Sequence, residues 1–146
     1  MSGIRIANPC TFAFTIKLMN NFSDTERKVL ASGIELRYLP DEYLFRQGQK
    51  AEFVFYLQEG SLVLEGTTGF VSIDRKGIFI GIEEAIEEKK HVYTAMTSSY
   101  AQFLVFERKY FQLLIDEFDL ALPYFESKKT EFNELLNTVQ PNYATI

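Results

Sequence analysis

The chain has 146 residues, of which 47% are hydrophobic and 24% are charged, a composition typical of one globular domain rather than a disordered segment. Acidic residues outnumber basic residues by 20 to 15, and the resulting net charge of −5 disfavours nonspecific nucleic-acid binding, which depends on basic side chains. The apolar runs are too short for a membrane span, and no secretory signal fits the sequence. We therefore expect a cytoplasmic protein with no membrane contact.

The chain contains one cysteine, Cys10, and one histidine, His91. One cysteine excludes an internal disulfide and a CxxC metal or redox pair, and one histidine excludes a three-histidine metal cage. A cysteine–histidine catalytic pair would have to join Cys10 to His91, and the residues around Cys10 do not resemble the setting of a nucleophile. We expect no catalytic residues, no metal site and no enzyme activity.

Residues 1–20 have a mixed pattern and are expected to form an N-terminal extension. The segment Ser23-Asp24-Thr25-Glu26 then has the form of a capping box, with Phe22 before it as a hydrophobic staple. This pattern predicts a helix from Asp24 to Ser32 with Ser23 as its N-cap, ended by Gly33.

Short apolar stretches separated by turn residues follow, and six of the eight glycines lie between positions 48 and 81. This spacing is typical of an all-β sandwich or barrel. The predicted strands are Ile34–Leu39, Tyr43–Arg46, Phe53–Glu59, Ser61–Gly66, Phe70–Asp74, Val92–Thr97 and Gln102–Glu107. Before the sixth strand, Glu83–Glu88 predicts one or two helical turns.

Helical periodicity returns in the last forty residues. An amphipathic stripe predicts a helix over Tyr110–Phe118, a break near Asp119–Pro123 and a second helix over Tyr124–Val139. One face of the second helix carries Phe125, Phe132, Leu136 and Val139. We expect a mainly β fold in a single domain of residues 21–146, with the β-barrel at about 34–107 and the C-terminal helices at about 108–140.

Five segments in order carry a resemblance to a known family. They are Asn21–Glu26, Leu39–Gly48, Val54–Val63, Gly77–Gly81 and, as closing strands and the start of a helix, Thr94–Met96 with Leu104–Phe111. Together they resemble the cyclic nucleotide-binding domain family, the jelly-roll sensor of catabolite-activator-type regulators and of cyclic-nucleotide-gated kinases and channels. The resemblance covers about residues 20–140 and implies a jelly-roll barrel with one N-terminal and two C-terminal helices.

In that family a helix N-terminus and an arginine hold the cyclic phosphate, and a glutamate binds the ribose hydroxyl. The resemblance implies cAMP or cGMP as ligand, and it places the ligand-binding cassette at Gly81, Ile82, Glu83, Glu84, Ala85, Lys89, Lys90 and Tyr93. Gly81 before the short acidic segment leaves free N–H groups at a helix start, which suit an anion.

The cassette also departs from the family pattern. Ile82 follows Gly81 where the family has glutamate, and Lys89 falls at the arginine position. A lysine offers a point charge where arginine offers a two-pronged grip. The glutamates at 83, 84, 87 and 88 would repel a phosphate, and Lys89 and Lys90 offset only half of their charge. We therefore expect a degenerate phosphate cassette, in which the glutamates and lysines fit a solvated helical turn equally well.

Three hypotheses follow for the function. The first is a stand-alone regulatory module in signalling that acts through a protein partner or as a homodimer. The second is a genuine cyclic mononucleotide receptor that uses lysines in place of the arginine, and the third is a sensor of another small ligand in the barrel mouth. The seven residues after Val139 leave no room for a helix-turn-helix, so no DNA binding is expected. The Phe125–Val139 stripe fits a lid over the ligand or a dimer seam.

Overall fold

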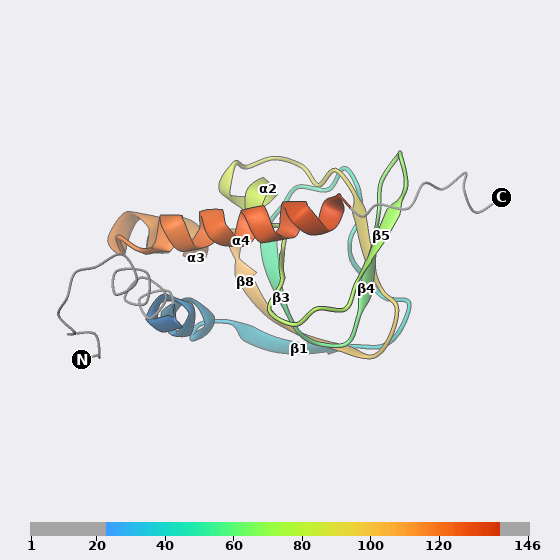
Figure 1. Cartoon of the computed structure of the whole chain (residues 1–146), viewed down its shortest axis with the longest axis horizontal. Coiled ribbons are helices and arrows are strands. Elements are labelled where there is room, and N and C mark those ends of the chain that lie inside the picture. Colours follow the sequence, from blue (N-terminus) through green and yellow to red (C-terminus); the bar gives the residue numbers. More distant parts are fainter. Residues whose placement is uncertain (1–22, 138–146) are drawn as a thin grey trace, which may run out of the picture.

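The computed structural model describes residues 23–137 (Figure 1). Residues 23–30 form a helix. The other elements are β1 Ile34–Tyr38, β2 Tyr43–Phe45, β3 Phe53–Glu59, β4 Leu62–Glu65, β5 Phe70–Ile73, β6 Phe79–Ile80, α2 Ile82–Ile86, β7 Thr94–Thr97, β8 Ala101–Glu107, α3 Arg108–Glu117 and α4 Ala121–Leu136.

The eight strands form two four-stranded antiparallel sheets, with the orders β1-β8-β3-β6 and β2-β7-β4-β5. Apart from the consecutive strands β4 and β5, neighbours in each sheet are not consecutive in the chain, as in a double-sheet jelly roll. Figure 1 shows the sheets facing one another and the helices gathered beside the first sheet. The prediction of a mainly β jelly roll with flanking helices is confirmed.

A hydrophobic core fills the space between the two sheets. Its strand residues alternate along the chain, as on β5, where Val71 and Ile73 are buried and Ser72 is exposed. Phe55 and Leu57 of β3 and Phe103 of β8 enter the same core from the first sheet. Side chains of the two sheets therefore fill the interior of the barrel.

A second core lies between the outer face of the first sheet and the helices. Phe79 and Phe106 project from the sheet, and Phe111 of α3 and Phe125 of α4 cover them. The rings of Phe111 and Phe125 stack at 4.5 Å between centroids. This core fixes α3 and α4 against the barrel.

The helix of residues 23–30 is held by two tyrosines from distant parts of the chain. The Tyr110 hydroxyl donates to the carbonyl oxygens of Lys28 and Val29, at 3.1 and 3.2 Å. The Tyr124 hydroxyl donates to Oε2 of Glu26 at 2.5 Å. Gly33, after this helix, leaves room for the Phe106 ring, which an added Cβ would approach to 2.7 Å.

Apart from shifts of one or two residues at the ends of several elements, three details differ from the sequence prediction. Ser23 is already helical, so it is not the N-cap. Strand β6 was not predicted, because two buried residues show no alternation. The break between the C-terminal helices ends at Leu120, and Pro123 lies in the first turn of α4, where a missing N–H costs no helical hydrogen bond. The predicted extension of residues 1–20 lies outside the described residues.

Candidate functional site

The predicted cassette begins where β6 passes into the short helix α2. Gly81 is the N-cap of α2 with φ of 93°, a left-handed conformation that favours glycine. Its carbonyl accepts a hydrogen bond from the Ala85 N–H at 3.0 Å. Ile82 and Ala85 are buried among the residues that pack against α3 and α4, so the side chain at the family's glutamate position is part of the hydrophobic core.

Lys89, at the family's arginine position, is paired with the chain's own carboxylates. Its Nζ lies 2.8 Å from Oε1 of Glu87 and 3.8 Å from Oε2 of Glu83. The hydrogen bond from Lys89 lowers the pKa of the Glu87 carboxyl, and the same contact raises the pKa of Lys89. Both groups are on the surface, so the pairing contributes little to stability, but it occupies the cation.

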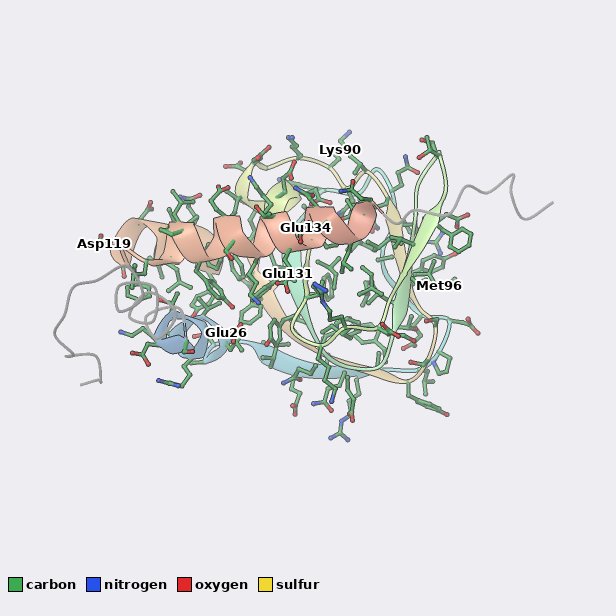
Figure 2. All side chains as sticks on the ribbon, viewed as in Figure 1. Glu26, Lys90, Met96, Asp119, Glu131 and Glu134 are labelled. Atoms are coloured by element: carbon green, nitrogen blue, oxygen red, sulfur yellow. The ribbon has the colours of Figure 1, made fainter. Side chains whose placement is uncertain are left out.

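Lys90 follows on the same loop and is exposed. Figure 2 shows it at the outer margin of the molecule, beside the loop that follows α2. Its backbone forms an antiparallel bridge with Lys50, and within residues 23–137 no ion pair of its ammonium group is found. Unlike Lys89, Lys90 is therefore not paired with a carboxylate of the described residues.

A buried polar cluster lies on the inner side of the same loop. Glu84 and His91 are only 6% and 3% exposed, and Oε2 of Glu84 lies 3.5 Å from Nδ1 of His91. The imidazole stacks on the Phe45 ring, with 3.5 Å between centroids and 9° between planes. Glu84 therefore points into the protein, away from a ligand outside the barrel.

Tyr93 completes this cluster. Its hydroxyl is buried and has no hydrogen-bond partner among the described residues. Burial, followed by the negative charge of Glu84, raises the pKa of Tyr93. The phenol and the carboxylate are close enough to interact electrostatically, but they are not in hydrogen-bonding geometry.

Helix α4 covers this end of the barrel. The Phe132 ring packs on Tyr93 at 5.9 Å between centroids, and Leu135 and Leu136 pack against the same inter-sheet core. Phe125, nearer the start of the helix, is fully buried in the second core. In Figure 1, α4 extends from α3 toward β4 and β5. The described part of the predicted stripe faces its own barrel, and Val139 lies outside the described residues.

Four cavities found on residues 23–137 are lined by other parts of the chain. The most apolar, of about 320 Å³, is lined mainly by Ile34, Leu36, Phe53, Val105 and Tyr110. None of the four is lined by a predicted cassette residue. Over the same residues there is no cluster of three or more potential metal ligands and no helix long and apolar enough to cross a membrane.

The structure places Gly81, Glu83, Glu84, Lys89 and Tyr93 around α2 and the loop that follows it. Their role in ligand binding stays a prediction. Sequence reasoning did not find the contact of Glu84 with His91 or the stack of His91 on Phe45. The alternation of His91, Tyr93 and Ala95 carries a signal for it, because residues at a spacing of two share one face of an extended chain.

The sequence matches the family model described as "Cyclic nucleotide-binding domain" over residues 35–118, more than half of the chain. No curated protein sequence matches it. Among solved structures, the c-di-GMP-responsive global regulator CLP of Xanthomonas campestris is similar with a TM-score of 0.66 and 18% identity, over 78% of this chain and 59% of that one.

The catabolite activator protein of Thermus thermophilus is similar with a TM-score of 0.61 and 14% identity, over 81% of this chain and 56% of that one. A PKAR domain, CBD2, with bound Sp-2Cl-cAMPS is similar with a TM-score of 0.59 and 24% identity, over 80% and 83%. The chain thus spans little more than half the length of both bacterial regulators. From the family match and the jelly-roll topology together, the chain belongs to the cyclic nucleotide-binding domain family.

Proposed function

We propose that this chain is a regulatory module of the cyclic nucleotide-binding domain family that acts through contact with protein, its cassette being occupied by its own side chains. The observation that carries the proposal is the packing of Phe132 on Tyr93, with Leu135 and Leu136 beside it, at the end of the barrel where the cassette lies. A ligand in that place would have to displace α4.

The charges of the cassette support the same conclusion. Lys89 is paired with Glu87 and Glu83, and Arg108 lies 3.7 Å from Glu88, so these three carboxylates compete with a phosphate for the nearby cations. Loss of one charge-assisted hydrogen bond costs about 1.5–3 kcal/mol, or roughly tenfold to a hundredfold in affinity. The cassette lacks the arginine and surrounds its substitute with negative charge.

One observation favours a second candidate, a genuine cyclic mononucleotide receptor. Gly81 keeps the left-handed N-cap, and Lys90 remains exposed on the same loop. The structurally similar PKAR domain holds a cAMP analogue, and CLP is described as responsive to c-di-GMP. In this reading α4 is a lid that opens for the ligand.

A thermal-shift experiment on the full chain separates the two functions. Cyclic AMP, cyclic GMP, c-di-GMP and AMP are each added at millimolar concentration. A ligand present at about 100 times its Kd adds about 2.7 kcal/mol, a shift of roughly 5–10 °C at this chain length. We expect no shift with any of them.

A shift of that size with a cyclic mononucleotide would establish the receptor and overturn the proposal. The variant Lys89→Ala with Lys90→Ala then tests the lysine grip, because its loss of the shift assigns phosphate binding to these residues. The matched control is Lys76→Ala, an exposed lysine on the turn between β5 and β6.

A further inference from the structure

Strand β1 forms one edge of the first sheet. It pairs with β8 on one side, and within residues 23–137 no strand pairs with its other side. Its first four residues are exposed and Tyr38 is half-buried. Figure 1 shows β1 along the lower margin of the molecule, with no coloured element beyond it. A free strand edge offers a row of backbone donors and acceptors to another chain.

The apolar residues of β1 make this edge unusual. Ile34 is 65% exposed and Leu36 is 42% exposed, although both lie on the face of the sheet that elsewhere forms the core. They also line the apolar cavity of about 320 Å³ that continues to Val105 and Tyr110. Edge strands of monomers often carry charge or are covered by another segment, whereas β1 exposes large apolar side chains on one face and is not covered by any described strand.

The charged residues of β1 make it complementary to itself. Glu35 and Arg37 lie on the opposite face from Leu36, and Gln102 contacts both side chains, at 2.7 Å from Oε2 of Glu35 and 3.1 Å from Nε of Arg37. In an antiparallel pair of two β1 strands centred on Leu36, Glu35 of each copy is directly opposite Arg37 of the other. Centring on Glu35 or on Arg37 would instead place like charges opposite one another.

We propose that two copies of this chain pair through β1 in antiparallel orientation, with the two-fold axis at Leu36. The two first sheets then form one continuous sheet, and Leu36 packs on Leu36 while Ile34 faces Tyr38. This is an isologous contact, in which each patch serves both copies. The inference rests on the proposed function, for which it names the partner, and it uses no residue of the cassette.

The oligomeric state of the full chain tests the pairing. Because β1 is short, the interface is smaller than that of a permanent dimer, and we expect a monomer–dimer equilibrium in the micromolar range by sedimentation equilibrium. Arg37→Glu replaces two attractive pairs with two repulsive pairs and should weaken the dimer about tenfold or more. The exposed charge reversal Lys76→Glu, away from β1, is the control and should leave the equilibrium unchanged.

The double variant Glu35→Arg with Arg37→Glu restores opposite charges across the axis and should recover the dimer. If Arg37→Glu weakened the dimer only by disturbing the fold of β1, the added Glu35→Arg would not restore dimer formation. A monomer at all concentrations up to about 1 mM, or a dimer indifferent to Arg37→Glu, would overturn the pairing.

Cross-linking tests the register. In a Cys10→Ala background, Leu36→Cys brings two thiols opposite one another, with Cα atoms about 4.5–5.5 Å apart, within reach of a disulfide. The matched control Ile34→Cys separates the two thiols by four residues along the strand, or about 13 Å. A disulfide dimer is expected only with Leu36→Cys, and equal cross-linking of both variants would refute the register.

The nucleotide panel is repeated on the same samples. A dimer that also binds a cyclic nucleotide would overturn the proposed function and leave the β1 pairing standing. A monomer that ignores all nucleotides would overturn the pairing alone.

Discussion

Nδ1 of His91 lies 3.5 Å from Oε2 of Glu84 inside the protein, and the imidazole lies flat on the Phe45 ring. Two polar side chains are thus buried together on the inner side of the loop that follows α2. Burial of a carboxylate is expensive unless it is paired, so this contact supports the loop on which Lys89 and Lys90 lie.

We expect His91→Ala to lower the free energy of unfolding by about 3 kcal/mol, because it removes the neighbour of a buried carboxylate and the stack on Phe45. Urea denaturation monitored by circular dichroism measures the change. Val92→Ala, at the exposed neighbouring position, serves as the control and should cost less than about 0.5 kcal/mol. Equal effects of the two variants would show that the cluster does not stabilise the loop.

Phe132→Ala should lower the free energy of unfolding by about 3–5 kcal/mol, since it opens a cavity between α4 and Tyr93. Asn133→Ala, on the exposed side of the same helix, is the control. If α4 is instead a loosely held lid, Phe132→Ala will cost no more than the control.

Four tyrosines predict a loss of stability at alkaline pH. Burial is the largest cause that raises the pKa of Tyr38, Tyr56, Tyr93 and Tyr124. Below pH of about 10 these phenols are protonated in both states, so their contribution is complete. Above that pH the unfolded chain releases protons that the folded chain retains, and stability falls by up to about 1.36 kcal/mol per pH unit for each group.

Urea midpoints measured between pH 8 and 11 test this expectation. Tyr93→Phe should reduce the loss of unfolding free energy per pH unit by the contribution of one tyrosine. Tyr100→Phe, at a position that is 71% exposed, should leave this loss unchanged. An unchanged slope in Tyr93→Phe would show that this phenol ionises in the folded protein.

Gly48 and Gly60 have similar φ angles but different surroundings, so substitutions at the two positions distinguish backbone strain from steric clash. Gly48 has φ of 91° and open space around it, whereas a Cβ at Gly60, with φ of 96°, would lie 2.3 Å from the Tyr100 carbonyl oxygen. Gly48→Ala should cost about 1–2 kcal/mol from the left-handed conformation alone. Gly60→Ala should cost clearly more, measured as the difference between the two urea midpoints, and equal costs would contradict the close packing at Gly60.

The strands were predictable because alternation and glycine-rich turns are local signals, and β3 has the bounds that these signals indicated. The two-residue strand β6 and the position of Pro123 inside α4 were not predictable. Burial on both faces hides the alternation of β6, and the start of α4 depends on its capping. The cassette was assigned by resemblance and stays a prediction, whereas the pairing of Lys89 with Glu87 and the inward direction of Glu84 depend on the three-dimensional path of the loop. No periodicity in a single sequence carries that information.

The hydrogen bond between Tyr124 and Glu26 joins residues 98 positions apart. During synthesis from the N-terminus, the helix of residues 23–30 emerges from the ribosome long before the tyrosine that holds it. At about 5–20 residues per second, roughly 5–20 s pass between the two. Among the described elements, the helix of residues 23–30 is therefore one of the last to acquire its native contacts, and until then its apolar side is open to chaperones and proteases.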